Sequence, residues 1–248
     1  MKKVITGFFM SWGMFCAIPC PVKLWDEQAR PMMLVCFPIL GILMGAIWTL
    51  LGFVLSKLQW GLFAAALMAV APFLLTGFIH LDGFMDCCDA ILSRRDLAER
   101  QRIMKDSHTG SFAVICVVIL ILMQFAGFSR FDFREQFPAL LLIPAATRAC
   151  AACAVMNLRP IGHSSYAGAF DSRVTSGHRT AAWILLAVTV LASAGLFGVY
   201  GLGAAAAAAG YWLAVWFADR NLGGMSGDVS GYGLTIGEAV GAIVLCLL

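Results

Sequence analysis

Charged residues are scarce in this sequence. Asp, Glu, Lys and Arg together make up 12% of its 248 residues, whereas hydrophobic residues make up 61%. A soluble domain carries about 25% charged and about 45–50% apolar residues. This deficit of charge argues against a soluble domain and indicates an all-α, polytopic integral membrane protein.

Other features are absent as well. No basic patch is interleaved with aromatic residues, so we expect no nucleic acid partner. The N-terminal stretch MKKVITGFFMSWGMFCAIP lacks an A-x-A-like cleavage site, so we expect no cleaved signal peptide. No linker or internal repeat is visible, which predicts a single membrane-embedded domain over residues 1–248. The sequence leaves the oligomeric state open.

The nine cysteines do not form a disulfide pattern, because most of them lie inside apolar segments. Cys150 and Cys153 make a formal C-x-x-C in TRACAACAVM. That segment is rich in small residues, which favours close packing between membrane helices over a redox or zinc role.

Apolar segments of about 20 residues predict membrane-spanning helices. The segment 4–19 is short and interrupted by Gly and Pro, so we expect it to lie in the interface or to re-enter the membrane. A shorter segment, 235–248, is a candidate seventh span. The sequence therefore predicts six to seven transmembrane helices, the first six over 31–54, 60–80, 111–128, 138–158, 180–199 and 202–218.

Basic residues are distributed unevenly between the two sides of the predicted spans. Most of the 17 lysines and arginines fall in the N-terminal segment and in the loops on the same side. The positive-inside rule then predicts that this side is cytoplasmic. All motif-like polar loops share it, so we expect an active site that faces the cytoplasm from the cytoplasmic (inner) membrane.

A short acidic stretch, HLDGFMDCCDA (80–90), ends the second predicted span. If the helix continues through it, Asp82, Asp86 and Asp89 lie at i, i+4 and i+7, within roughly 60° on one face. Carboxylates this close repel, so a cation must lie between them or their pKa values must rise. Oxygen ligands favour Mg²⁺ or Mn²⁺, which keep positions for water and substrate phosphates. The stretch predicts a metal-assisted site for a phosphorylated substrate.

The alternative is a solvated helix end, in which these aspartates cap the helix and pair with Arg94 or Arg95. The scarcity of other polar residues beside them favours the metal site. His80 falls roughly on the opposite side of the helix. We therefore expect it to act on the site indirectly, through the residues that form it, or to lie in the membrane interface.

The next segment, LSRRDLAERQRIMKDSHTGSFAV, is rich in basic residues. Arg94 and Arg95 are donors for anionic oxygens, Lys105 is a candidate phosphate contact, and Asp106 is a candidate further metal ligand. An ordinary charged cytoplasmic loop explains the same pattern, and spacing alone does not decide between the two.

Three further residues stand out. Asp228 lies in NLGGMSGDVSG (221–231), interpreted as a Gly-rich loop whose backbone can approach a phosphate or as a simple turn. His163 lies in the polar segment 159–173, where no nucleophile–base pair can be assigned. Arg148 lies within a predicted span, where a charge is costly and tends to be functional or paired. It either snorkels to the surface or pairs with an acidic residue, and we favour a role near the site.

Several motifs, in order along the chain, resemble the cobalamin synthase family, the adenosylcobinamide-GDP ribazoletransferases. HLDGFMDCCDA and RIMKDSHTGSFAV are similar to the family's H-E-D-G-L-A-D-x-x-D-G and I-M-K-D-S-x-x-G-x-[FY]-G. FFMSWGMFCAIPCPV, CFPILGILMGAIW and LGGMSGDVSG resemble three more of its motifs. The resemblance covers most of the chain.

The resemblance implies an Mg²⁺-dependent membrane transferase. Its substrates are adenosylcobinamide-GDP and α-ribazole or its 5′-phosphate, and its products are adenosylcobalamin or its 5′-phosphate and GMP. Leu81 stands where the family usually has Glu, which leaves the number of metal ligands in doubt. The metal would then depend on Asp106, Asp228 or water.

Two rival functions are weaker. A CDP-alcohol-type phosphotransferase uses D-G-x-x-A-R followed by G-x-x-x-D-x-x-x-D, but Asp86 and Cys87 occupy the A-R positions and the second half is absent. An ion-coupled transporter usually has its site near the bilayer midplane within repeated halves, and no repeat is visible.

The sequence predicts three groups of site residues. The predicted catalytic residues are Asp82, Lys105 and Asp106; the predicted Mg²⁺ ligands are Asp82, Asp86 and Asp89; and the predicted substrate-binding residues are Arg94, Arg95, Arg148, His163 and Asp228.

Overall fold

The structure is a computed structural model that describes residues 2–162 and 173–248. Within these ranges the chain forms α-helices joined by turns and short 3₁₀ segments, with no β-strand, which confirms the predicted all-α class. The α-helices are α1 (Lys2–Phe15), α2 (Arg30–Leu58), α3 (Leu62–Leu75), α4 (Ile79–Leu92), α5 (Leu97–Ile103), α6 (Ser111–Phe128), α7 (Ile143–Asn157), α9 (Ser176–Phe197), α10 (Leu202–Leu222) and α11 (Gly227–Leu247). The 3₁₀ segments are η1 (Glu27–Ala29), η2 (Phe137–Leu142) and η3 (Gly198–Gly201).

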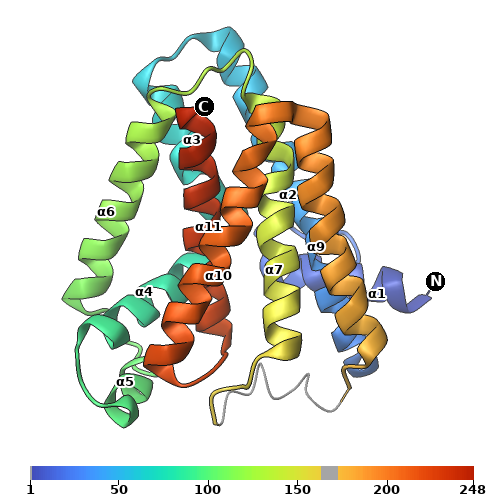
Figure 1. Cartoon of the computed structure of the whole chain (residues 1–248), viewed down its shortest axis with the longest axis vertical. Coiled ribbons are helices and arrows are strands. Elements are labelled where there is room, and N and C mark those ends of the chain that lie inside the picture. Colours follow the sequence, from blue (N-terminus) through green and yellow to red (C-terminus); the bar gives the residue numbers. More distant parts are fainter. Residues whose placement is uncertain (1, 163–172) are drawn as a thin grey trace.

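Among the described residues, five helical stretches are long and apolar enough to cross a membrane, or six if the bent pair α3–α4 counts as one span. One of the five, Ser176–Leu222, contains both α9 and α10, which fold back on each other (Figure 1). This pairing accounts for the difference from the six to seven spans that the sequence predicts. The polytopic membrane fold is confirmed.

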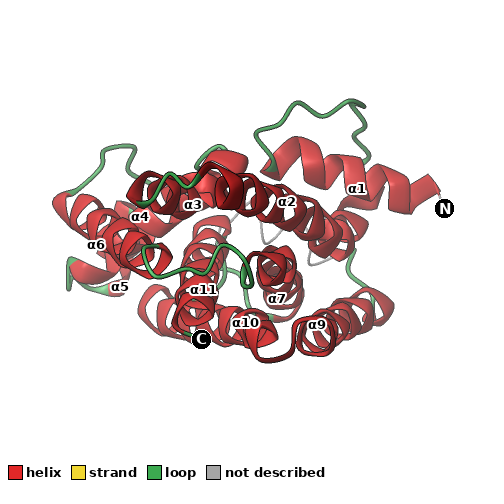
Figure 2. Cartoon of the chain, turned by 90° about the horizontal axis from the view of Figure 1, so that it is seen from above, coloured by secondary structure: helices red, strands yellow, loops and turns green. Residues whose placement is uncertain are grey.

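Two helices occupy the middle of the bundle. Seen from above, α7 and α11 are surrounded by α2, α4, α6, α9 and α10 (Figure 2). Every residue of α7 from Ile143 to Met156 is buried. Small side chains allow α2 and α7 to approach closely. A Cβ atom at Gly41 of α2 would lie only 2.6 Å from the Cα atom of Ala145 in α7. Cys150 and Cys153 are buried in this helix, in line with the packing interpretation.

The outer helices expose apolar side chains. Only 22% of the residues of α6 are buried inside the protein. In the most apolar 18-residue stretch of Ser176–Leu222, the buried share is 17%. Their exposed residues include Ile119, Leu191 and Leu213. Such apolar surfaces are stable against lipid tails and unstable against water, so these helices form the lipid-facing sheath of the bundle.

The predicted span 60–80 is wrong as a single straight helix. The chain breaks after α3, and α4 continues at an angle of 92° to it. Pro72 lies near the end of α3, and the turn that follows has positive φ at Gly77 (59°) and Phe78 (66°). A left-handed backbone ends a helix, and glycine adopts it at low cost. The acidic stretch therefore lies on a separate helix that runs across the bundle.

The segment 221–231 is also not a simple loop. Helix α11 already begins at Gly227, where the Ser226 side chain caps it by accepting a hydrogen bond from the Val229 backbone N–H (3.1 Å). It is a full 21-residue helix, longer than the predicted 235–248 segment. Asp228 consequently lies in a helical first turn.

Most of the polar motifs come together at one end of the molecule. Figure 1 shows α5 and the turn between α10 and α11 at the same end, opposite to the C-terminus. We call this the α5 end. The turns that follow α2, α6 and α9 lie at the other end.

Candidate functional site

Helix α4 separates acidic from apolar residues. Asp82 is exposed, and Asp86 and Asp89 are half-buried. Leu81, Phe84, Cys87 and Cys88 are buried against the rest of the bundle. Helix α4 includes all three aspartates, so their predicted spacing on one helical face is confirmed. However, α4 is not a continuation of the span before it.

A fourth carboxylate reaches this face from the other end of the sequence. A Cβ atom at Gly83 would lie 2.8 Å from the Cα atom of Asp228, so α4 and the first turn of α11 are in backbone contact. Asp86 is within electrostatic reach of Asp82, Asp228 and Asp89. We call these four residues the carboxylate cluster.

The carboxylate cluster has no basic partner in residues 2–162 and 173–248. The ion pairs found there join other groups: Arg30 or Arg173 with Glu27, Arg102 with Glu99, His108 with Asp106 and Arg148 with Glu238. Like charges held close together in a partly dry setting oppose one another's ionisation. The arrangement is therefore suited to binding a cation.

Asp89 has an additional structural role. Its Oδ2 accepts a hydrogen bond from the Gly110 N–H (2.7 Å), and its Oδ1 accepts one from the Ala113 N–H (2.9 Å). Gly110 is the N-cap of α6 and has no side chain, so Asp89 caps this helix from α4. A carboxylate at a helix N-terminus is also favoured by the helix dipole. Both oxygens of this predicted metal ligand therefore already have partners.

The carboxylate cluster fits Mg²⁺ held jointly with a substrate. Over the described ranges, no three His, Cys, Asp or Glu side chains are close enough to enclose a metal ion. Mg²⁺ is usually bound by one or two carboxylates, with water and phosphate oxygens completing its coordination. Asp82, Asp86 and Asp228 provide oxygen donors of that kind at a partly exposed surface. Mg²⁺ binding stays a prediction.

The basic segment is held beside the carboxylate cluster through α5. Arg100 donates hydrogen bonds to the Asn221 backbone oxygen (3.1 Å) and to its side-chain oxygen (2.8 Å). Gln101 donates to the Leu222 backbone oxygen (2.8 Å). These bonds attach α5 to the end of α10, a few residues before Asp228. This role of Arg100 has no signal in the sequence, because its partner Asn221 lies 121 residues away.

The predicted phosphate contacts in this segment are all solvent-exposed. Arg94, Arg95 and Lys105 have exposed side chains. Asp106 accepts hydrogen bonds from the His108 ring and from the His108 backbone N–H (3.0 Å), and these bonds hold the pKa of Asp106 below its usual value. The structure places no contact between these residues and the carboxylate cluster, so their predicted roles stay predictions.

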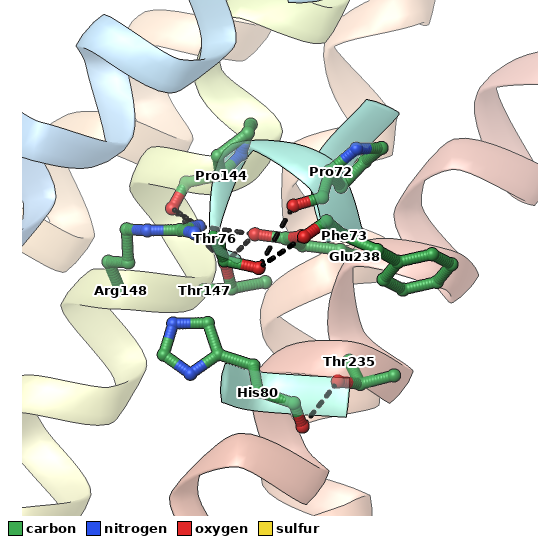
Figure 3. Close-up of polar contacts among 9 residues, drawn as sticks. All are labelled: Pro72, Phe73, Thr76, His80, Pro144, Thr147, Arg148, Thr235 and Glu238. Carbon is green, nitrogen blue, oxygen red and sulfur yellow. Dashed lines mark hydrogen bonds and ion pairs between the residues drawn. The ribbon is translucent and has the colours of Figure 1, made fainter. Parts of the chain in front are cut away.

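Arg148 lies inside the bundle. Its side chain is 1% exposed and forms an ion pair with Glu238 of α11, and it also donates to the Pro144 backbone oxygen (3.1 Å) (Figure 3). We call Arg148 and Glu238 the buried pair. The structure thus gives Arg148 an acidic partner in the core and does not bring it to the carboxylate cluster. Glu238 was missed in the sequence, although it is a lone carboxylate in an apolar segment.

His80 faces the same interior. It is buried, its ring stacks on Phe15, and its backbone oxygen accepts a hydrogen bond from the Thr235 hydroxyl (3.0 Å) (Figure 3). This burial on the core side of α4 fits its predicted position opposite the exposed Asp82. The predicted substrate-binding residue His163 lies outside the described residues.

Comparisons with known proteins agree with the motifs. The profile of the cobalamin-5-phosphate synthase family matches residues 7–246. A Clostridium botulinum protein (strain Alaska E43 / Type E3) named adenosylcobinamide-GDP ribazoletransferase is 36% identical over 250 residues, covering 100% of this chain and 99% of that protein. A Clostridium perfringens protein (strain 13 / Type A) with the same name is 37% identical over 254 residues, covering 100% of both chains. No solved structure matches.

The match extends over nearly the whole chain, and it includes the acidic stretch of α4 and the first turn of α11 that meet in the carboxylate cluster. This confirms the resemblance inferred from the motifs: the chain belongs to the cobalamin-5-phosphate synthase family.

Proposed function

We propose that the protein is an adenosylcobinamide-GDP ribazoletransferase. Relatives that match it over nearly their full length have this name. The observation that supports the proposal best is the meeting of two distant motifs, because α4 and the start of α11 together bring Asp82, Asp86 and Asp228 to one surface. A transferase for phosphorylated substrates needs such a surface, since it must hold a metal and a phosphate together.

The proposed reaction exchanges one bond at phosphorus for another. A hydroxyl oxygen of α-ribazole, or of its 5′-phosphate, forms a new P–O bond to the phosphorus next to the cobinamide. The P–O bond to the GMP phosphate breaks, GMP leaves, and the hydroxyl proton is released. The products are adenosylcobalamin, or its 5′-phosphate, and GMP.

The side chains divide the work of binding and orientation. One or two of the carboxylates Asp82, Asp86 and Asp228 would hold Mg²⁺, which when bound supplies neutralisation of the charge on phosphate oxygens. Arg94, Arg95 and Lys105 are exposed donors that can bind the remaining phosphate oxygens of the diphosphate. Asp106 is ionised and exposed beside Lys105, where it can accept a hydrogen bond from a substrate hydroxyl.

We also propose the orientation of the protein. The α5 end carries the basic segment, and the positive-inside rule places such an end in the cytoplasm. The relatives are bacterial proteins, which fits the cytoplasmic membrane. Under this arrangement the substrates reach the carboxylate cluster from the cytoplasm.

The test is GMP release by the purified protein in lipid. The reaction contains adenosylcobinamide-GDP and Mg²⁺, with α-ribazole either supplied or omitted. We expect GMP only when α-ribazole is present, and we expect a chelator of divalent cations to stop its release. GMP release without α-ribazole would indicate hydrolysis, and no release from folded protein would overturn the proposal.

A further inference from the structure

One face of α11 carries a series of residues that contact α4 and α7. Asp228, Gly231, Thr235 and Glu238 are spaced i, i+3, i+7 and i+10. At about 100° per residue they fall within roughly 80° of one another around the helix. The series runs from the carboxylate cluster at the start of α11 to the buried pair near its middle.

Gly231 allows the backbones of α4 and α11 to touch. A Cβ atom at Gly231 would lie 3.0 Å from the backbone oxygen of His80 and 3.2 Å from its Cα atom. One turn earlier on α11, the Asp228 backbone meets Gly83 of α4. A Cβ atom at Gly83 would lie 2.8 Å from the Asp228 Cα atom. Two glycines thus face each other across the contact, and a larger side chain at either would push the helices apart.

Thr235 fixes the register of this contact. Its hydroxyl donates a hydrogen bond to the backbone oxygen of His80 (3.0 Å) (Figure 3). His80 lies in the first turn of α4, two residues before Asp82. Thr235 is 3% exposed, so the bond forms away from water and a sliding of α11 along α4 would leave its groups unpaired.

Glu238 fixes the same face of α11 one turn further along the helix. It pairs with Arg148 of α7 and accepts a hydrogen bond from the Thr147 hydroxyl (3.3 Å). A buried ion pair loses its compensation if either partner rotates away. Contacts with α7 therefore set the rotation of α11 about its own axis.

We propose that Gly231 and Thr235 are positioning residues, which set how close Asp228 comes to Asp82 and Asp86. The inference rests on the proposed function, because it concerns the alignment of the groups that bind metal and substrate. Both residues are buried in α11, and both act through the placement of Asp228 against α4.

The first experiment compares two glycine substitutions in α11. In Gly231→Ala the new methyl group meets the α4 backbone. In the control Gly241→Ala it meets α10, where it would lie 2.6 Å from the Ala207 Cβ atom and 2.7 Å from the Gly203 backbone oxygen. The control contact is at least as tight, but it lies away from the carboxylate cluster.

Three quantities are measured for each variant in lipid: the thermal unfolding midpoint, the affinity for Mn²⁺ by electron paramagnetic resonance without substrate, and the rate of GMP release at saturating substrate. We expect both variants to unfold at lower temperature than the wild type. Only Gly231→Ala should also weaken Mn²⁺ binding and lower kcat, each by about tenfold or more, because a metal site tolerates little displacement of its ligands.

The second experiment uses Thr235. Thr235→Val keeps the shape of the side chain and removes the donor, and Thr235→Ser keeps the donor. We expect the valine variant to lower kcat several-fold with little change in KM, and the serine variant to restore most of the rate. Equal rates for the two variants would show that the hydrogen bond does not position the site.

The outcomes separate the two proposals. Equal losses of Mn²⁺ affinity and of kcat in Gly231→Ala and Gly241→Ala would overturn the positioning role. A wild-type protein that binds Mn²⁺ but releases no GMP would overturn the proposed function, while a selective loss of Mn²⁺ binding in Gly231→Ala would still support positioning. A wild-type protein that neither binds Mn²⁺ nor releases GMP would overturn both.

Discussion

The buried pair and the carboxylate cluster are two charged places in a protein with few charges, and they differ in how the charge is balanced. Arg148 and Glu238 have side chains only 1% and 9% exposed, and each has the other as its counter-charge. Asp82, Asp86 and Asp228 lie at a partly exposed surface, and the ion pairs of the described residues leave them out. A charge balanced within the protein holds helices together, whereas a surplus of one sign is free to bind a ligand.

The largest expected effect comes from removing one charge of the cluster. Asp82→Asn should lower the rate of GMP release by at least about 100-fold, because it removes an oxygen donor that stabilises charge in the reaction. Expression and thermal stability should stay close to wild type, since Asp82 is exposed.

Asp132→Asn is the matched control for this substitution. Asp132 is also an exposed aspartate, but it lies in the turn after α6, at the end opposite α5. We expect its rate of GMP release to equal that of the wild type. Equal activity of Asp82→Asn and Asp132→Asn would remove the distinction between the cluster and an ordinary surface charge.

The second effect concerns the buried pair and is measured as stability. Glu238→Gln leaves the Arg148 charge buried without its partner, which should cost about 3–5 kcal/mol. The double variant Arg148→Met with Glu238→Met removes both charges and should recover most of that loss. Thermal unfolding in detergent measures both, and a single variant as stable as the double one would contradict the structural role of the pair.

The smallest effect is expected at Asp89, which shares features of both places. Asp89→Asn keeps one of the two acceptors of the α6 cap and loses the other. It also loses the favourable interaction with the helix dipole, about 0.3–1 kcal/mol. Asp89→Ala loses the cap as well, about 0.5–2 kcal/mol. If capping is the main role of Asp89, Asp89→Asn keeps far more GMP release than Asp82→Asn, and equal losses would place Asp89 among the metal ligands.

Hydropathy and local spacing predicted much of the molecule. Long apolar runs fix where α2, α6, α7, α9 and α10 lie, because a bilayer demands length and apolarity together. The one-sided placement of Asp82, Asp86 and Asp89 follows from helical periodicity alone. The family is identified by short sequence motifs, and recognising them does not depend on how the helices pack.

Contacts between distant residues could not be predicted in the same way. The bend between α3 and α4 depends on positive φ angles at Gly77 and Phe78, and phenylalanine gives no sequence signal for that conformation. The cap that Asp89 places on α6 joins residues 21 and 24 positions apart through the fold. The single-domain organisation and the roles of Lys105, Asp106 and His163 stay predictions.

The bend between α3 and α4 also decides how a bulky molecule can approach. A helix that runs across the bundle offers its flank, with about 10 Å along its axis between Asp82 and Asp89, and a helix that ends at a surface offers only its tip. The 92° bend therefore presents these carboxylates along the side of a helix, where a bound molecule can meet several of them at once.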